Sequence, residues 1–375
     1  MLVARQDSVG DVLLAGPAVR AVAAGAGRVS LLCGPRGREA ARLLPGVDEV
    51  VVAHAGWIDA EPERVTRAGI DALVDRLTDL EIDQALILTS FHQSPLPLAL
   101  LLRMAGVPVI AAVSVDYPGS LLDVRHRVDE DVHEVERGLS LAATLGYRLP
   151  EGDDGRLAVR RDPGADVPEL EGPYVVVHPG ASVPARAWAP ERHAALVEAL
   201  AAEGRRVVVT GGTAERPLTA RVAGGRRPEE RVVTDLGGRV DLAGLAEVLA
   251  GAEVVVVGNT GPAHLAAAVG TPVVSLFAPV VPAVRWRPWG VRHVLLGDQA
   301  AACAGSRARM CPVAGHPCLD GVPVEEVVAA VGALAPLRER PEGSGRRGPG
   351  NPKGMPRSDK EDLRRGAPVH QEVGG

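Results

Sequence analysis

Short runs of valine and leucine alternate with longer stretches rich in alanine, leucine and arginine along most of the chain. The short runs are apolar at consecutive positions, which is typical of strands that are buried on both faces. Strands of this kind that alternate with helices predict parallel sheets covered by helices, the α/β class. The strands expected in the first half are Leu2–Arg5, Val29–Cys33, Glu49–Ala53, Gln84–Leu88 and Val109–Val113.

Helices are expected between these strands, for example at Ala15–Ala24 and Ile70–Leu80. A further helix is predicted over Asp131–Leu145, because it carries a mixed charged face and is followed by Gly146, a common helix stop. The acidic triplet Asp129–Asp131 would begin this helix. We therefore interpret the triplet as a solvated first turn and not as a metal site.

The pattern changes between Pro150 and Pro173, where polar and turn-forming residues dominate. The alternation of strands and helices then restarts, which predicts a second parallel sheet. Its expected strands are Tyr174–His178, Arg206–Thr210, Arg231–Asp235, Glu253–Val257 and Pro272–Phe277.

This organisation predicts two α/β domains. We expect a first domain over residues 1–160, a linker over 161–173 and a second domain over 174–338. A ligand would bind in the cleft at the carboxyl ends of the strands. Residues 339–375 are rich in glycine and proline and poor in apolar residues, so we expect a disordered tail.

Composition narrows the class of protein. Hydrophobic residues make up 46% of the 375 residues, but only four tryptophans, three tyrosines and two phenylalanines are present, so valine, leucine and alanine must build the core. Acidic residues number 47 and basic residues 41, which gives a net charge of −6. This balance argues against a general nucleic-acid binder. An anionic ligand would need a local site.

The chain lacks targeting and membrane signals. Met1–Asp7 has neither the basic nor the apolar segment of a signal peptide. The most membrane-like stretch, Leu96–Leu102, is interrupted by Arg103 and is too short to span a bilayer. We therefore expect a soluble, cytoplasmic protein.

The first motif with possible chemistry follows the first strand. Within Asp7–Leu14, Gly10 permits a tight turn into a helix, and Asp11 stands where that helix begins. Aspartate is a common N-cap, which is one interpretation of Asp11. The other interpretation is a carboxylate at the rim of the cleft that acts as a general base.

The strongest motif joins the valine run Val254–Val257 to the polar turn Gly258–Pro262. Proline at the first helical position marks a helix start. Free backbone N–H groups of Thr260 and Gly261, together with the helix dipole, would form a phosphate site. An ordinary turn is the alternative. His264 lies inside the helix, where a packing role is more common than catalysis.

Two similar junctions follow other strands of the second half. His178–Ser182 is followed by Arg186, whose guanidinium suits a diphosphate. Thr210–Glu215 ends in a carboxylate that could accept hydrogen bonds from ribose hydroxyls. Each residue alone could equally be a surface residue. Three glycine-containing turns in one predicted domain favour a nucleotide diphosphate.

Other classes of site lack their signatures. No dinucleotide fingerprint G-x-G-x-x-G follows the first strand of either predicted domain, and the sequence contains neither a P-loop motif nor the hydrolase elbow G-x-S-x-G. Cys303, Cys311 and Cys318, with His316 nearby, superficially suggest a metal site, but their spacing is not that of a zinc ribbon. We favour a structural thiol cluster over a zinc site.

At these residues the chain resembles glycosyltransferase family 9, the ADP-heptose:lipopolysaccharide heptosyltransferases and their relatives. The resemblance covers residues 1–335. It rests on four ordered motifs: D-S-V-G-D-V-L-L-x-x-P-A-V-R, H-P-G-A-S-x-P-A-R-x-W, G-G-T-x-E and G-N-T-G-P-A-H-L-A-A-A-V-G-T-P. Three departures are Asn259 for an aspartate of several members, Arg186 for a lysine, and Ser306 for a further cysteine.

The resemblance implies a GT-B fold of two Rossmann-like domains, with the acceptor bound by the first and the nucleotide-sugar by the second. It implies that Asp11 is the catalytic base, with Ser8 and Gly10 beside it on the acceptor side. The donor-binding residues that it implies are Ser182, Arg186, Gly212, Glu215, Asn259, Thr260, Gly261, Pro262 and His264.

The activity implied is an inverting, metal-independent transfer of a sugar from a nucleotide-diphospho-sugar, ADP-heptose in this family, to a hydroxyl of a glycan or glycoconjugate. No other cofactor is implied. Acceptor contacts would come from the loops Ser90–Pro97 and Val115–Arg127. A monomer is expected, and a transient association with a membrane surface is compatible with this role. The alternatives are another GT-B enzyme, such as an epimerase or a transferase with a different donor, and a non-catalytic nucleotide-sugar-binding protein.

Overall fold

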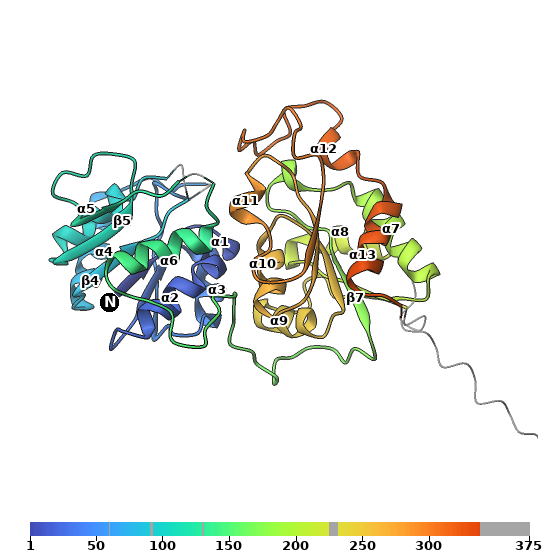
Figure 1. Ribbon diagram of the computed structural model, residues 1–375, viewed down its shortest axis with the longest axis horizontal. Coiled ribbons are helices and arrows are strands. Elements are labelled where there is room, and N and C mark those ends of the chain that lie inside the picture. Colours follow the sequence, from blue (N-terminus) through green and yellow to red (C-terminus); the bar gives the residue numbers. More distant parts are fainter. Residues whose placement is uncertain (60, 91–92, 130, 225–231, 338–375) are drawn as a thin grey trace, which may run out of the picture. The chain divides into compact units, whose positions relative to one another are not determined.

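Two parallel sheets form the framework of the protein (Figure 1). The computed structural model describes residues 1–59, 61–90, 93–129, 131–224 and 232–337. Each sheet has six strands, and all neighbouring strands run parallel. The predicted α/β class is therefore confirmed. The predicted disorder of residues 339–375 concerns residues outside those described.

The two sheets share one strand order. In the first sheet the order is β3-β2-β1-β4-β5-β6, and in the second it is β12-β11-β10-β7-β8-β9. Both are the doubly wound order in which the chain reverses direction across the sheet, between β1 and β4 and between β10 and β7. The strands are β1 Leu2–Ala4, β2 Ser30–Cys33, β3 Glu49–Val52, β4 Gln84–Ile87, β5 Val109–Val113, β6 Val124–His126, β7 Tyr174–His178, β8 Arg206–Val209, β9 Val233–Asp235, β10 Val254–Gly258, β11 Val273–Leu276 and β12 His293–Leu296.

The strand predictions agree with these bounds to within about a residue or two, and Arg231 of one prediction lies outside the described residues. Two strands, β6 and β12, were not predicted. Both are edge strands, and most of their residues are only half-buried. Their apolar pattern is therefore weaker than that of the inner strands.

The helices cover both faces of the two sheets. Helix α6 begins at Glu134, with His133 as its N-cap in a capping box with Glu136. Asp129 and Asp131 lie before this helix, so the prediction that they belong to its first turn is wrong, and Glu130 lies outside the described residues. The helices are α1 Val9–Leu14, α2 Gly16–Ala23, α3 Arg38–Leu43, α4 Arg67–Asp79, α5 Leu96–Met104, α6 Glu134–Thr144, α7 Pro190–Ala202, α8 Arg216–Ala223, α9 Leu242–Ala250, α10 Gly261–Ala268, α11 Ala283–Trp286, α12 Pro317–Asp320 and α13 Val324–Leu334.

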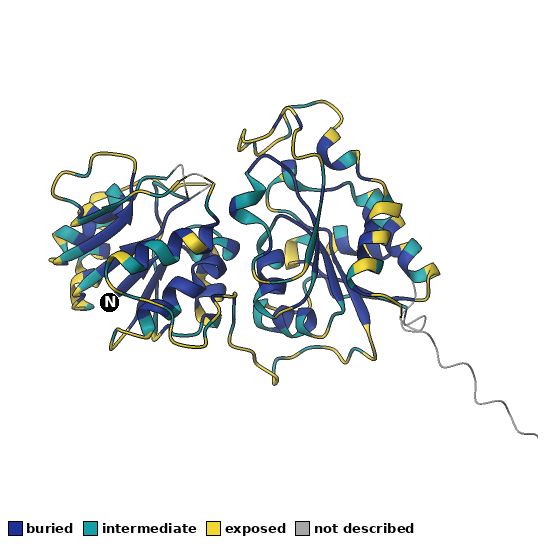
Figure 2. Ribbon diagram, viewed as in Figure 1, coloured by how far each residue is buried: buried dark blue, intermediate teal, exposed yellow. Residues whose placement is uncertain are grey.

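The inner strands are buried on both faces (Figure 2). In β10, Val254 and Val256 pack with α7 and α13, whereas Val255 and Val257 pack with α9 and α10. The cluster that contains Val255 also contains side chains of α1 and α2, which cover the first sheet. This shared apolar cluster explains why Met1–Pro336 forms one compact unit.

Residues 145–173, all of which the structure describes, contain neither helix nor strand. This segment connects α6 to β7 and is held by ion pairs, because Arg20 binds Asp153 (2.6 Å) and Arg161 binds Glu247. The predicted boundaries at 160 and 174 stay a prediction. Among the described residues, no helix has the length and apolar character needed to cross a membrane.

Helices α1 and α10 pack against each other through glycines. A Cβ added to Gly10 would lie 2.8 Å from Cδ2 of His264, and one added to Gly261 would lie 3.1 Å from Cγ1 of Val9. Any larger residue would push the two helices apart. The glycines therefore set how closely the loop ends of the two sheets approach.

We predict that Gly10→Ala lowers the free energy of unfolding by about 1–3 kcal/mol, because the new methyl group must displace a buried ring. Gly332 in α13 is the matched control, since a Cβ there would meet no atom within 4 Å. Gly332→Ala should stabilise the protein by about 0.5–1 kcal/mol, because alanine is the better helix former. Urea denaturation of both variants checks this, and equal effects would contradict the proposed contact.

Candidate functional site

Asp11 lies in the first turn of α1, just beyond the carboxyl end of β1. The N-cap of this helix is Ser8, whose backbone is extended, so Asp11 is the third helical residue. The interpretation of Asp11 as the N-cap is therefore wrong. The Ser8 hydroxyl donates to Oδ2 of Asp11 (2.7 Å). The carboxylate thus points toward other polar groups instead of closing its own helix end.

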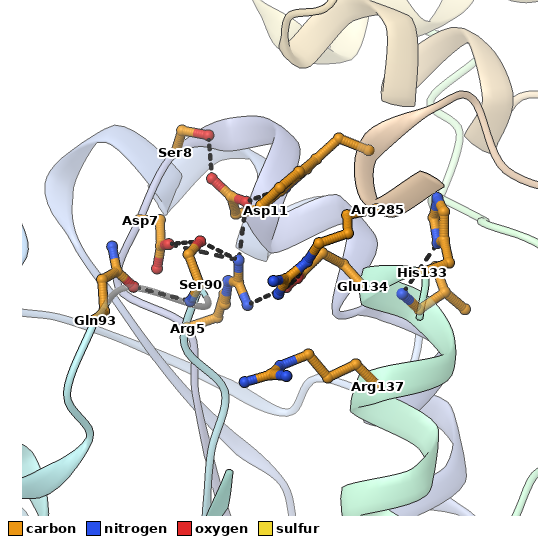
Figure 3. A network of polar contacts seen from close by, with 12 residues as sticks. Arg5, Asp7, Ser8, Asp11, Ser90, Gln93, His133, Glu134, Arg137 and Arg285 are labelled. Carbon is orange, nitrogen blue, oxygen red and sulfur yellow. Dashed lines mark hydrogen bonds and ion pairs between the residues drawn. The ribbon is translucent and has the colours of Figure 1, made fainter. Parts of the chain in front are cut away.

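Arg5 directly follows β1 and is the centre of a buried network of charged side chains (Figure 3). The residue is only 4% exposed. Its Nη2 donates to Asp11 Oδ1 (2.8 Å) and to Ser90 Oγ (3.0 Å). Its Nη1 donates to Glu134 Oε2 (3.3 Å), and Asp7 Oδ2 lies 3.5 Å from Nη2. Three carboxylates therefore surround one guanidinium. They come from the loop after β1, from α1 and from α6.

Helix α11, which follows β11 of the second sheet, adds two side chains to this network. Arg285 is 1% exposed, and its Nε donates to Glu134 Oε1 (2.9 Å) while Nη2 contacts the same oxygen. Trp286 Nε1 donates to Asp11 Oδ1 (3.3 Å). Both oxygens of Asp11 and both oxygens of Glu134 therefore accept hydrogen bonds.

Burial and ion pairing compete at the two aspartates, with different outcomes. Burial raises the pKa of Asp7 to about 6, against the attraction of Arg5. Burial would also raise the pKa of Asp11. At Asp11, however, the Arg5 guanidinium and the hydrogen bonds from Ser8 and Trp286 outweigh burial and hold the pKa below its ordinary value. Asp11 is therefore ionised at neutral pH.

The turn after β10 presents Thr260 as the N-cap of α10. Its N–H donates to the Gly258 carbonyl (2.8 Å), so the prediction that this N–H is free is wrong. The Gly261 N–H and the buried Thr260 Oγ1 make no hydrogen bond with any residue that the structure describes. These two groups and the helix dipole are suited to an anion.

The turn after β7 leads into the short 3₁₀ helix Pro184–Arg186. Arg186 is half-buried, and its Nε has no hydrogen-bond partner within the described part of the chain. Burial lowers the pKa of Arg186, and the charge of Asp11 opposes this effect. Arginine stays protonated in proteins, so Arg186 is a partly desolvated cation. Ser182, just before it, is exposed.

The turn after β8 contains the half-buried Glu215. Gly212 donates its N–H to Glu215 Oε2 (2.7 Å), and the other oxygen lies over Gly180. A Cβ at Gly180 would lie 2.0 Å from Oε1, so a larger residue there would displace this carboxylate. The predicted residues of the β7 and β8 turns are thus brought together.

Asn259 and His264 are buried and support the loop ends of the second sheet. Asn259 exchanges two hydrogen bonds with the Ala278 backbone, each 3.4 Å long, which ties the end of β10 to the end of β11. Burial lowers the pKa of His264 to about 4, so the ring is neutral at physiological pH. Pro262 occupies the second position of α10 and not the predicted first position, but a missing N–H costs nothing in either place.

The two predicted acceptor loops reach the same edge of the first sheet. Ser90 belongs to the Arg5 network, and Ser94 donates to Asp116 Oδ2 (3.2 Å), which links the loops. Phe91 and His92 lie outside the described residues. Val115 and Tyr117 are more than 80% exposed, so this rim has apolar side chains that face solvent.

The late cysteines lie in and against the apolar core of the second sheet. Cys303 and Cys318 are buried, Cys311 is half-buried, and all are free thiols. Burial raises the pKa of Cys318 to about 12. Within the described ranges, no group of three or more histidine, cysteine or acidic side chains is placed to hold a metal ion.

Sequence reasoning missed four residues of the network. They are Arg5, Glu134, Arg285 and Trp286. Two signals were present in the sequence: an arginine that ends an apolar strand, and two of the four tryptophans within the pentapeptide R-W-R-P-W at 285–289. The salt-bridge partners come from distant elements, so their pairing could not be seen in sequence.

The loop ends of both sheets thus contain the motifs that the sequence singled out. The family model for glycosyltransferase family 9 (heptosyltransferase) matches residues 72–315. The chain belongs to glycosyltransferase family 9. The predicted resemblance is therefore confirmed.

Two lipopolysaccharide heptosyltransferases are similar to this chain in sequence. Lipopolysaccharide heptosyltransferase 1 of Pseudomonas aeruginosa is 34% identical over 243 residues, which cover 62% of this chain and 64% of that protein. Lipopolysaccharide heptosyltransferase 3 of Escherichia coli K12 is 29% identical over 211 residues, which cover 54% of this chain and 60% of that protein. The matches thus span less than two thirds of these relatives' lengths.

A solved heptosyltransferase structure has the same architecture. The structure of E. coli ADP-heptose LPS heptosyltransferase II matches with a TM-score of 0.67 and 20% identity, over 89% of this chain and 98% of that chain. Two doubly wound parallel sheets in one unit are the GT-B arrangement, so the predicted fold is confirmed.

We predict that Asp7→Asn removes a pH-dependent cost of folding. Burial raises the folded-state pKa of Asp7 to about 6, so between about pH 4 and pH 6 the folded protein keeps a proton that the unfolded chain has lost. The free energy of unfolding of the wild type should therefore fall as the pH rises through this range. Relative to wild type, Asp7→Asn should gain up to about 3 kcal/mol across this range. Denaturation between pH 4 and 7 measures the difference, and a constant difference would contradict the shift.

Proposed function

We propose that the protein is an inverting glycosyltransferase that moves heptose from ADP-heptose to a hydroxyl of a glycan or glycoconjugate. Membership in family 9 and the names of the heptosyltransferase relatives support the reaction class. The observation that carries the proposal is the ionised Asp11 carboxylate, held by donors from both sheets beside the start of α10.

In the proposed reaction, Asp11 is the general base. The acceptor hydroxyl attacks the anomeric carbon, its oxygen forms the new glycosidic bond, and its proton passes to the Asp11 carboxylate. The bond between the anomeric carbon and the diphosphate oxygen breaks, and the leaving ADP keeps the electron pair. Attack opposite the leaving group inverts the anomeric centre. General bases contribute about 10²–10⁴-fold to such steps.

The leaving diphosphate gains negative charge, which the second sheet can stabilise. Arg186 supplies a partly desolvated cation, and the start of α10 supplies the Gly261 N–H, the Thr260 hydroxyl and the positive end of a helix dipole. Because these groups can hold the diphosphate themselves, we propose that transfer needs no metal. Glu215, beside the β7 turn, would bind the ribose hydroxyls through the oxygen not used by Gly212.

We predict that Asp11→Asn lowers heptose transfer by about 10²–10⁴-fold, because the amide cannot accept the proton. Binding of ADP should stay close to wild type, since the diphosphate groups lie on the second sheet. Asp48→Asn is the control, because Asp48 accepts from the Val29 N–H (2.8 Å) at the amino ends of β2 and β3, at the opposite end of the strands from Asp11. Transfer assays with purified ADP-heptose and calorimetry with ADP check this. Full turnover by Asp11→Asn would contradict the assignment.

We predict that Thr260→Val weakens ADP binding by about tenfold, because one hydrogen bond to a charged group is lost. The melting temperature without ligand should not fall, because the buried hydroxyl has no partner among the described residues. Ser275→Ala is the matched control, since Ser275 in β11 has another buried hydroxyl without a partner in the described ranges. Calorimetric titration should find Ser275→Ala unchanged, and equal weakening of both variants would refute a direct contact.

A further inference from the structure

We propose that Trp286 is a positioning residue for Asp11, an indole supplied by the second sheet that orients the carboxylate carried by the first. This inference rests on the proposed function, in which Asp11 is the general base. It adds a role for a residue that none of the sequence motifs contains.

The first step is the geometry at the carboxylate. Three donors contact Asp11: Arg5 Nη2 at 2.8 Å and Trp286 Nε1 at 3.3 Å on Oδ1, and Ser8 Oγ at 2.7 Å on Oδ2. Arg5 and Ser8 belong to the same chain segment as Asp11. The indole is the one of these three donors that comes from the second sheet, so it alone ties the carboxylate's orientation to the donor side.

The second step is what holds the indole. The guanidinium carbon of Arg285 lies 4.9 Å from the centroid of the Trp286 ring, as a cation over an aromatic face. Arg285 is itself fixed by Glu134, whose other oxygen accepts from Arg5. The indole therefore has little freedom to rotate, and its N–H is aimed at Asp11 before any substrate binds.

The third step distinguishes orientation of the Asp11 carboxylate from a mere link between the two halves of the chain. The same segment has a second tryptophan, Trp289, which donates to the Gly155 carbonyl (2.9 Å) and stacks on His133 with ring centroids 4.4 Å apart. Both tryptophans therefore bridge from the second sheet to residues before 160. The Trp289 N–H donates to Gly155 and not to Asp11, so Trp289 is a matched control in structure and chemistry.

Several charged groups face Asp11, and each must be counted in a pH experiment. They are Arg5 beside β1, Asp7 in the following loop, Glu134 and Arg137 on α6, Arg186 after β7, and His264 on α10. None of them is altered by substitution of Trp286. Loss of the indole N–H removes a hydrogen bond to the charged carboxylate, so the pKa of Asp11 should rise.

The experiment compares Trp286→Phe with Trp289→Phe. The Asp11 carboxyl titration is followed by ¹³C NMR in protein labelled at aspartate carboxyl carbons, with Asp11→Asn used to assign the signal. We expect a higher Asp11 pKa in Trp286→Phe and an unchanged pKa in Trp289→Phe. In transfer assays, the acidic limb of the pH profile should move to higher pH only in Trp286→Phe. Its kcat should fall about tenfold, with the donor KM within about twofold of wild type.

A second substitution keeps the inference testable if Trp286→Phe unfolds. Benzothienylalanine at position 286 replaces the indole N–H by sulfur and preserves the shape of the ring, so it should reproduce the pKa rise with a near-native melting temperature. An unchanged Asp11 titration in both position-286 variants would overturn the inference, as would an equal rise in Trp289→Phe. If wild type transfers no heptose, the proposed function fails, whereas the NMR comparison still decides whether Trp286 controls the carboxylate.

Discussion

The buried guanidinium of Arg5 is the interaction on which the candidate site depends. It directly follows the central strand β1 and contacts groups from the β1 loop, α1, the loop after β4 and α6. An arginine buried in this way costs several kcal/mol of desolvation unless its donors are satisfied by acceptors in good geometry. Asp11, Glu134 and Ser90 accept hydrogen bonds from its Nη atoms, and Asp7 adds a third negative charge, whereas its Nε has no partner among the described residues. Any shift of these elements would leave charge uncompensated, so the network specifies their relative positions.

The same logic extends to the second sheet. Glu134 accepts from Arg5 through one oxygen and from Arg285 through the other, so one carboxylate joins two arginines from different sheets. Replacement of either arginine by a neutral residue would leave a buried charge with half of its partners. The ion pairs act together with the glycine contact between α1 and α10. The close contacts of Gly10 and Gly261 set the distance between the loop ends of the two sheets. The ion pairs of Glu134 set how these loop ends are aligned.

Sequence could predict much of the fold because its signal is local. Val254–Val257 are apolar at every position, and the structure buries both faces of β10. The edge strands β6 and β12 were missed because half-buried residues such as His293 leave no continuous apolar run. The motifs that follow β1, β7, β8 and β10 were found because a strand-to-helix turn has a local signature. The sequence does not show which backbone N–H groups in these turns lack a hydrogen-bond partner. In the structure, the Thr260 N–H donates to the Gly258 carbonyl.

The network was harder to predict because its residues are joined only by the fold. Arg5 and Glu134 are 129 positions apart, and Asp11 and Trp286 are 275 apart. No pattern in one sequence relates such positions, since charge pairing has no period. Trp286 and Trp289 stood out only because aromatic residues are rare in this chain.

The low pKa of Asp11 has a consequence for how a base at this position would work. A carboxylate that is strongly stabilised in its charged form is fully ionised but weakly basic. Its basicity rises if a donor leaves it as the acceptor enters. Ser8 is the donor suited to this, because a hydroxyl rotates at little cost whereas Arg5 and Trp286 are held by other contacts. An acceptor hydroxyl that takes the place of Ser8 would donate to Oδ2 of a carboxylate that is still aligned through Oδ1. Oδ1 then keeps the carboxylate oriented while Oδ2 is open to the acceptor hydroxyl.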